Sequence, residues 1–142
     1  MVRERFEVLG NPQGKARART VNGHSYTPQN TVLYENWIKQ CFTEQCEHRW
    51  FDKQPLNMVI WAMFPITKST SKKDKKLMAE WKLHPTKKPD ADNIAKVICD
   101  ALNGVAYGDD TQIINLSVKK RYTDKEPMVI VYIEEMSVKE EE

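Results

Sequence analysis

The sequence predicts one α/β (α+β) domain with a small mixed β-sheet of about four strands flanked by helices. Apolar residues recur at helical spacing in two separated segments, and short apolar or alternating runs precede and follow them. The resulting order is strand, helix, strand, helix, helix, strand, strand. The length of 142 residues is typical of one domain. We assign residues 1–135 to this domain and expect residues 136–142 to be an acidic, disordered tail.

The first strand is expected over residues 2–9, where apolar and charged residues alternate before a Gly-Asn-Pro sequence. A basic loop then continues to about Pro28. Apolar residues between Leu33 and Phe42 recur every three or four positions, which predicts an amphipathic helix with Asn30 or Thr31 as its N-cap.

The middle of the chain contains a short, strongly apolar run at residues 58–64. It stops at Pro65, and we expect a buried strand there. Ser71 is followed three positions later by Asp74, which is typical of a capped helix start. A short lysine-rich helix is therefore expected from this point to Trp81.

The last third begins with a second amphipathic helix, expected to start near Asp92 and to stop at Asn103-Gly104. Residues 112–122 and 127–134 are both strand-like. Because only residues 123–126 separate them, we expect these two strands to form a hairpin.

Basic residues are clustered, although the net charge is only +2. Residues 134–142 contain five acids and one lysine, so the rest of the chain has 21 bases against 15 acids. Such clusters fit a phosphate-rich partner, and they also fit a solvated helix face beside a flexible loop. The candidates for contact with a DNA backbone are Lys15, Arg17, Arg19, Lys72, Lys73, Lys76, Lys87 and Lys88.

The sequence also argues against several classes of protein. The longest apolar run has seven residues, whereas a membrane-spanning helix needs roughly 18. The charged residues 3–5 leave no room for a signal peptide, so we expect a cytoplasmic protein without a membrane partner. The absence of a glycine-rich phosphate loop predicts that no nucleotide cofactor is used.

Acidic residues gather around the second amphipathic helix. On a helix that advances about 100° per residue, Asp92, Lys96 and Asp100 lie within an arc of about 80°, opposite the apolar side chains. Asp90 lies two residues before Asp92 and can point to the same side. Asp109-Asp110 returns after the helix, where a turn enters a strand. These carboxylates can meet if helix and strand pack side by side.

Such a cluster has a definite chemistry. Two carboxylates about 5 Å apart repel by roughly 3 kcal/mol at an effective dielectric of 20, so a cluster must protonate, separate or bind a cation. Mg²⁺ or Mn²⁺ would suit these hard oxygen ligands and could activate a phosphodiester, with Lys96 stabilising the developing charge. Ordinary roles remain open: a helix cap for Asp92, turn residues at 109–110 and an ion pair for Lys96.

Three motifs are shared with one protein family. They are Pro89-Asp90-Ala91-Asp92-Asn93 with Lys96, then Asp100-Ala101-Leu102-Asn103-Gly104, then Asp109-Asp110-Thr111-Gln112-Ile113. With them, the chain resembles the RusA family of phage and prophage Holliday junction resolvases. The opening Gly10–Arg19 and Tyr26-Thr27-Pro28 also match, so the resemblance covers residues from about 5 to 134. Ala18 departs from the family, because many relatives carry Pro there.

The resemblance implies a site and an activity. By motif, Asp90, Asp92 and Asp110 are the essential, metal-holding acids, Lys96 is the essential basic residue, and Asp109 is a possible further member. The family is homodimeric, requires Mg²⁺ or Mn²⁺ and makes paired, symmetric nicks in four-way DNA junctions. We therefore expect a metal-dependent junction endonuclease that hydrolyses phosphodiesters in line. The alternatives are a branched-DNA-binding protein that does not cut, and a structural dimer whose acids are only caps and turns.

Overall fold

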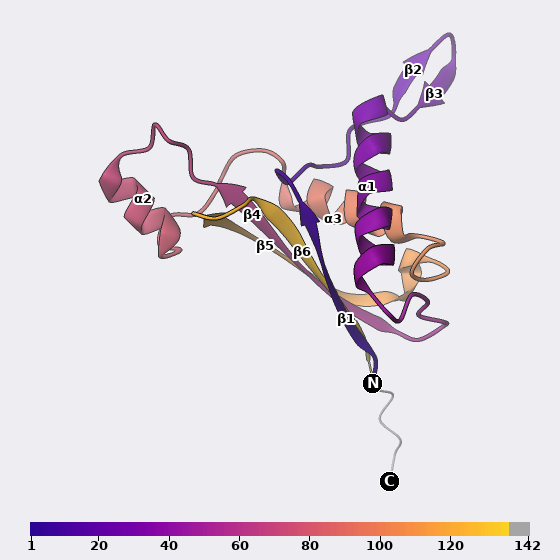
Figure 1. Ribbon diagram of the computed structural model, residues 1–142. Coiled ribbons are helices and arrows are strands. Elements are labelled where there is room, and N and C mark those ends of the chain that lie inside the picture. The colour runs from indigo at the N-terminus through magenta and orange to yellow at the C-terminus, as the bar shows by residue number, and fades with distance from the viewer. Residues whose placement is uncertain (137–142) are drawn as a thin grey trace.

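The computed structural model describes residues 1–136, which form a four-stranded mixed sheet, three α-helices and a separate two-stranded hairpin (Figure 1). Across the sheet the order is β1-β6-β4-β5. The strands are β1 (Arg3–Leu9), β6 (Met128–Glu135), β4 (Leu56–Pro65) and β5 (Ile113–Thr123). β6 is antiparallel to β1 and β4, whereas β4 and β5 are parallel. The predicted α+β class is confirmed. The expected disordered tail lies outside the described residues, except for Met136.

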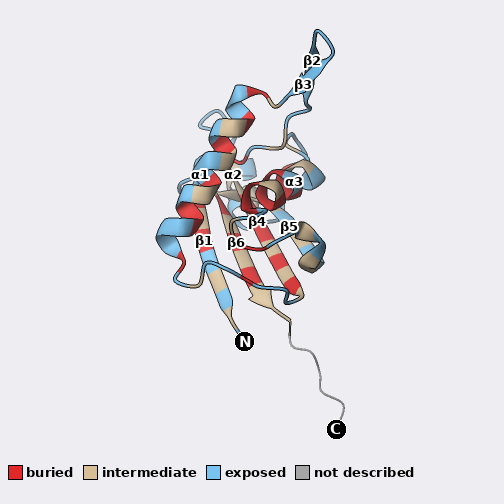
Figure 2. Cartoon of the chain, turned by 90° about the vertical axis from the view of Figure 1, so that its right-hand side faces the viewer, coloured by how far each residue is buried: buried red, intermediate tan, exposed pale blue. Residues whose placement is uncertain are grey.

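Helices α1 (Gln29–Gln45) and α3 (Ala91–Leu102) cover one face of the sheet and contact each other. β4 alternates between fully buried residues, which face these helices, and half-buried residues on the other face. Figure 2 shows this buried layer between the helices and the sheet. The largest side chains in it are Tyr107, Phe6, Phe42 and Phe51. None of the helices within residues 1–136 is long and apolar enough to cross a bilayer.

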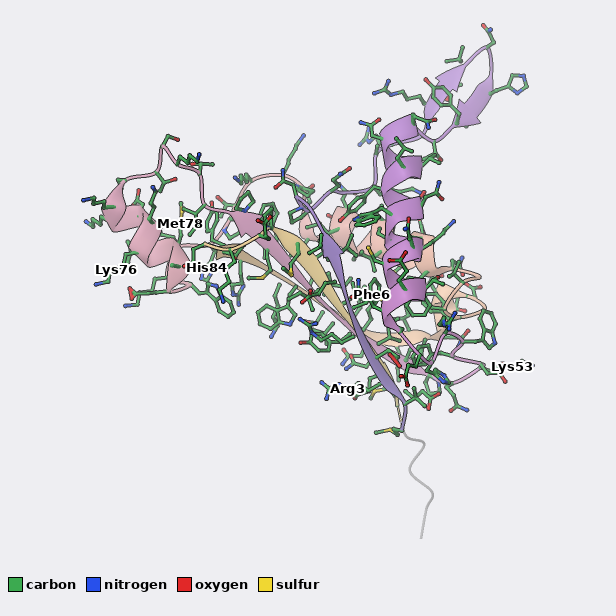
Figure 3. The ribbon with its side chains drawn as sticks, in the orientation of Figure 1. Arg3, Phe6, Lys53, Lys76, Met78 and His84 are labelled. Carbon is green, nitrogen blue, oxygen red and sulfur yellow. The ribbon has the colours of Figure 1, made fainter. Side chains whose placement is uncertain are left out.

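Helix α2 (Lys72–Ala79) lies beyond one end of the sheet, with no buried residue of its own. It begins as the sequence predicts, because the Ser71 hydroxyl accepts a hydrogen bond from the backbone N–H of Asp74 at 3.2 Å. In Figure 3 its side chains Lys76 and Met78 lie on the opposite side of the molecule from the two-stranded hairpin. α2 is therefore an appendage of the sheet rather than a part of the core.

Two predictions about elements are wrong. β5 and β6 do not form a hairpin, because β4 lies between them and pairs with both. β4 is ten residues long and fully buried on one face, and its backbone forms ladder hydrogen bonds with a strand on each edge. If β5 and β6 paired with each other instead, β4 would keep a partner on one edge only. Helix α1 is capped by Pro28 rather than by Asn30 or Thr31.

The sequence-based expectation also missed a hairpin in the basic loop. β2 (Arg19–Val21) and β3 (His24–Tyr26) pair in antiparallel fashion. Asn22 and Gly23 form the turn between them with positive φ angles of 52° and 78°. Asn-Gly is the usual sequence of such two-residue turns, because both residues tolerate this left-handed conformation. The dipeptide was therefore the signal that could have predicted the hairpin.

Candidate active site along helix α3

Helix α3 has two chemically distinct sides. Its apolar side chains are buried against α1 and the sheet. Asp92 and Lys96 are exposed, and Asp100 is half-buried, on the remaining side. The 3.6-residue period therefore places acid, base and acid outside the core, as the sequence predicts.

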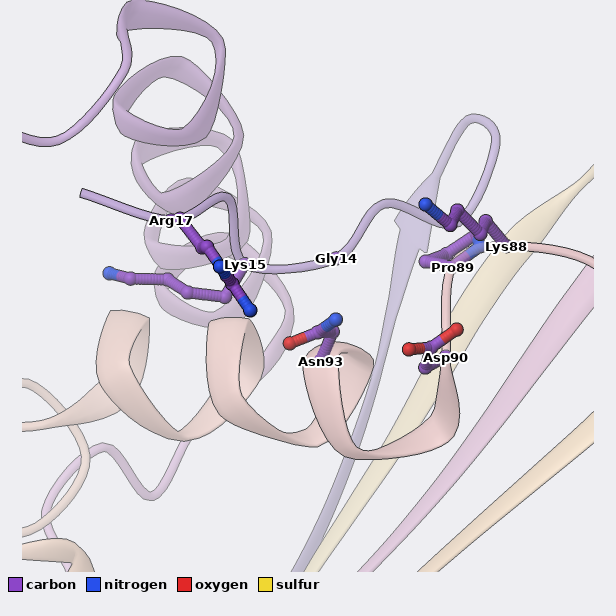
Figure 4. A pocket seen from close by; sticks show the side chains of 7 residues that line it. All are labelled: Gly14, Lys15, Arg17, Lys88, Pro89, Asp90 and Asn93. Atoms are coloured by element: carbon purple, nitrogen blue, oxygen red, sulfur yellow. The ribbon is translucent and has the colours of Figure 1, made fainter. Parts of the chain in front are cut away.

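Asp90 is the N-cap of α3, but its side chain makes no capping hydrogen bond. An aspartate at this position ordinarily accepts a hydrogen bond from the first turn of its helix. The carboxylate instead lines a hollow of about 610 Å³ together with Lys15, Arg17, Lys88 and Asn93 (Figure 4). Asp90 is thus available to an external partner.

Asp109 and Asp110 are adjacent, but they have different surroundings. Asp109 caps the short 3₁₀ helix η1 (Asp110–Gln112), and its carboxylate accepts a hydrogen bond from the N–H of Thr111 at 3.3 Å. Hydrogen bonding with Asp109 raises the pKa of Asp110, and burial and the negative charges of Asp109 and Asp100 raise it further. Asp109 therefore has a structural role in the turn, while Asp110 lies in an environment crowded with negative charge.

Gln112 and Tyr107 fix this turn beside α3. The side-chain amide N–H group of Gln112 donates to the carbonyls of Phe51 at 3.2 Å and of Gln54 at 3.1 Å. Its amide oxygen accepts from the backbone N–H of Gly108 at 2.9 Å. The buried Tyr107 hydroxyl donates to the carbonyl of Cys99 in α3 at 2.8 Å. Neither residue was assigned a role from the sequence, although Gln112 stands in a shared motif, because their partners are distant carbonyls that a motif does not show.

A second hollow brings the two acidic segments together. Its volume is about 360 Å³, and Asp92, Lys96, Asp100 and Asp110 contribute to its wall. Burial and then the nearby charges of Asp110 and Asp100 raise the pKa of Cys99, which also lines it, to about 11. Helix and strand thus lie side by side as expected, and the two ends of the predicted motif share one surface. Asp90 faces the neighbouring hollow.

The basic loop lies along the same side of α3. A third hollow of about 480 Å³ is lined by Lys15, Arg17, Asn93 and Lys96 together with two alanines. It shares Lys15, Arg17 and Asn93 with the hollow at Asp90, and Lys96 with the hollow at Asp110. The three hollows therefore follow one another along the helix. We call them, with their lining residues, the α3 surface.

Gly14 and Lys15 hold the loop against α3. The backbone N–H of Lys15 donates to the carbonyl of Asn93 at 3.0 Å. A Cβ at Gly14 would lie 2.9 Å from the Cβ of Asn93 and 3.0 Å from that of Pro89, which is too close for any side chain. Glycine is therefore required for the approach of the loop to the start of the helix.

Lys15 has an internal role that the sequence did not indicate. Its ammonium group pairs with Glu35 of α1 at 3.0 Å and with Asp100 of α3 at 3.3 Å, and its side chain is only 19% exposed. Burial opposes the charged form, but the two carboxylates outweigh it and raise the pKa of Lys15. Lys15 thus ties the loop to both helices.

The remaining predicted DNA contacts lie in three places. Arg17 and Arg19 are exposed on the loop and on β2, and Lys88 borders the hollow at Asp90. Lys87 lies over the Phe64 and Tyr122 rings, with its nitrogen 6.0 and 5.8 Å from their centres. The lysines of α2 lie on the other side of the molecule from the hairpin and line none of the three hollows. The structure thus brings Arg17 and Lys88 to the α3 surface, and it does not bring the α2 lysines there.

The donor set fits a hard divalent cation in kind, because Asp90, Asp92 and Asp110 offer only carboxylate oxygens and crowding raises the pKa of Asp110. Within the described chain, however, no three acidic, histidine or cysteine side chains lie close enough together to hold a metal ion as they stand. Two of the three predicted ligands share a hollow, and Asp90 would have to turn toward them.

Comparisons with known proteins identify the family of the chain. The family described as "Endodeoxyribonuclease RusA" matches residues 10–134, which include every motif residue on the α3 surface. A protein of Bacillus subtilis (strain 168), "Uncharacterized protein YqaN", is 35% identical over 139 residues, covering 94% of this chain and 96% of that protein. The matched region contains the three helices, β4, β5 and nearly all of β6, while β1 precedes it. The chain therefore belongs to the RusA family of endodeoxyribonucleases.

Proposed function

We propose that the chain is a metal-dependent, structure-specific endonuclease that resolves four-way DNA junctions by paired, symmetric nicks. Membership of the family implies a junction endonuclease. The observation that supports the finer assignment is the hollow where Asp92 of α3 and Asp110 of η1 lie with Lys96. Acids placed between basic residues weaken phosphate binding unless a cation intervenes, so this arrangement favours catalysis over binding alone.

Asp90, Asp92 and Asp110 would hold Mg²⁺ or Mn²⁺ in this proposal. When bound there, the cation polarises the scissile phosphodiester and lowers the pKa of the attacking water. Asp110 is the carboxylate with the clearest reason to bind a cation, because its neighbours Asp109 and Asp100 raise its pKa, and a positive charge would relieve that repulsion.

The other residues of the α3 surface would position the phosphate. Lys96 lies one turn after Asp92 and would stabilise the negative charge that develops on the phosphate as water attacks in line. Arg17 and Lys88 border the hollow at Asp90, where they would hold the DNA backbone at either side of the scissile bond. Asn93 lines both hollows, and its amide can bond to a phosphate oxygen.

The substrate would explain a dimer. A four-way junction has two-fold symmetry, and paired nicks require two equivalent sites, so we propose that two copies act together. Each copy would then bring one α3 surface to one of the two opposed strands.

One observation favours a second candidate. Because Asp90 faces a hollow of its own and the described chain has no group of three potential ligands within metal-binding range, the chain could bind branched DNA without cutting it. Both candidates predict junction binding. They differ only in the reaction with a divalent cation.

The test is cleavage of a four-way junction by the purified chain with and without Mg²⁺, beside a linear duplex of the same sequence. The proposal expects symmetric paired nicks in the junction only, and only with the cation. Tight junction binding with no product in either Mg²⁺ or Mn²⁺ would favour the non-catalytic candidate.

A further inference from the structure

The hairpin of β2 and β3 stands away from the rest of the domain. All six of its strand residues are exposed, and both Figure 1 and Figure 2 show it projecting beyond the start of α1. Within the part of the chain that the structure describes, no hydrogen bond or ion pair joins these strands to the body. An isolated two-stranded hairpin is at best marginally stable. Packing inside the chain therefore does not explain it.

The two faces of the hairpin differ sharply. Cross-strand partners share a face, and residues two apart on a strand point to the same side. One face therefore carries two pairs, Arg19 with Tyr26 and Val21 with His24. The other face carries only Thr20 paired with Ser25. We call the first set the arm face, and it contains every large, cationic or aromatic side chain of the hairpin.

The chemistry of the arm face matches DNA. No acidic residue occurs between Glu7 and Glu35, so the face meets no negative charge from its own segment. An arginine bonds to phosphate oxygens, and an aromatic ring packs on sugars or bases. A two-stranded ribbon is also narrow enough to enter the major groove. Val21 and Tyr26 are 53% and 47% exposed, which leaves their apolar surface free for such contacts.

The position of the hairpin points to the same partner. Its first strand continues directly from the loop that Gly14 and Lys15 fix on α3. Arg17, two residues before the hairpin, lines two hollows of the α3 surface. A DNA strand lying on that surface would therefore reach the hairpin without leaving the protein.

We propose that the arm face binds a groove of the duplex beside the scissile phosphate, with Arg19 on the backbone and Tyr26 and Val21 against sugars or base edges. This inference rests on the proposed function in one respect, since it takes DNA as the substrate. It adds a second contact, outside the reacting centre, that determines how firmly and in which orientation a junction arm is held.

The experiment compares matched double variants by fluorescence anisotropy, without divalent cation, on a labelled four-way junction. Arg19→Ala with Tyr26→Ala removes the arm face, and Thr20→Ala with Ser25→Ala alters the other face of the same hairpin. We expect the first variant to raise the Kd about tenfold and the second to change it less than twofold. Hydroxyl-radical footprints should show that only the first variant loses protection along one groove of an arm.

Three further measurements separate the outcomes. Both variants should melt with the intact chain. At saturating protein with Mg²⁺ the Thr20→Ala/Ser25→Ala variant should also cut at the normal rate, because neither residue lies on the arm face or on the α3 surface. Equal Kd values for the two variants would overturn the inference. So would a change in mass by light scattering in the first variant alone, because that face would then bind a second copy. An intact chain that binds but never cuts would reject the proposed nuclease, while anisotropy would still test the arm.

Discussion

The chain exposes two basic regions of similar composition, and they differ in what they are attached to. The loop of residues 14–18, from which the hairpin continues, is fixed to α3, and its cations Lys15 and Arg17 border the hollows beside the acidic residues. The α2 lysines, at positions 72, 73, 75 and 76, follow the end of β4 on a helix that contacts β5, and they line none of these hollows. Proximity to the carboxylates, rather than local charge, distinguishes a candidate substrate contact from a solvated face.

Basic residues within the loop also differ in their partners. Lys15 and Arg17 are two residues apart, yet Lys15 is held by two carboxylates while Arg17 is exposed. A charged side chain whose partners are inside the chain stabilises the fold, whereas one that lacks them is free to bind phosphate. The following predictions, from the largest expected effect to the smallest, test whether position on the α3 surface decides function.

The largest effect is expected for Asp92→Asn. Loss of one preorganised group typically lowers the rate by about 10² to 10³, so single-turnover cleavage of a junction should fall by this factor. Binding should be retained or tighter, because one repulsive charge is removed. Asp124→Asn, in the turn after β5, is the matched control and should cut normally. If Asp92→Asn cuts as fast as the intact chain, the α3 surface is not the reacting centre and the comparison loses its basis.

Substitutions of the two adjacent acids of the turn should have different effects on cleavage and on stability. Asp110→Asn is expected to slow cutting by about 10²-fold with little change in stability. Asp109→Ala removes the cap of η1, so it should lower the urea midpoint of unfolding and leave cleavage nearly unchanged. Cleavage rates and urea unfolding together measure both effects. The reverse pattern would exchange the two roles.

The double variant Arg17→Ala with Arg19→Ala should weaken junction binding about tenfold. Two lost phosphate contacts should also reduce the slope of log K against log salt by about 2. Anisotropy titrations at several salt concentrations measure both quantities. An unchanged slope would mean that the loop does not contact the backbone, whatever happens to the affinity.

Lys15→Met should act through the fold. Removal of the ammonium leaves Glu35 and Asp100 unpaired, and because the pair is partly exposed we expect a loss of about 1–2 kcal/mol of unfolding free energy. The pKa of Lys15 is raised from 10.5, so its contribution is complete below that pH and is lost as pH rises through the higher folded value. Urea unfolding at pH 7 and pH 11 checks this. The difference in unfolding free energy between the intact chain and the variant should be smaller at pH 11 than at pH 7.

The smallest effect is expected for Lys72→Ala, Lys73→Ala and Lys76→Ala combined. These side chains are exposed and line none of the hollows of the α3 surface, so affinity should fall less than about threefold and stability should change by less than about 0.5 kcal/mol. The same anisotropy and unfolding assays apply. A loss as large as that of the arginine pair would show that DNA also contacts α2, and the distinction between the two basic regions would fail.

Periodic features of the sequence predicted their structures well. The apolar period of α3 fixed which side of the helix holds Asp92 and Lys96, because helix geometry alone decides that. The apolar run at residues 58–64 predicted a strand, and Ser71 predicted the start of α2. These inferences depend only on neighbours within a few residues, and for that reason they are confirmed.

Features that depend on distant partners could not be predicted. The turn after β5 does not reveal that β4 separates β5 from β6, since strand order follows from burial of the whole sheet. The sequence near Lys15 does not show Glu35 and Asp100, which lie 20 and 85 positions further along the chain. The motif distinguished Asp110 from Asp109 but could not show that Asp109 caps η1, because that capping depends on the backbone conformation.

The pairing of β1 with β6 has a consequence for synthesis. Within the described chain, β1 pairs with residues 128–134 of β6, which are synthesised after the other strands. Residues 110–123, which complete the α3 surface and edge the sheet, also emerge late. Incomplete translation products therefore lack both the closed sheet and the assembled carboxylates.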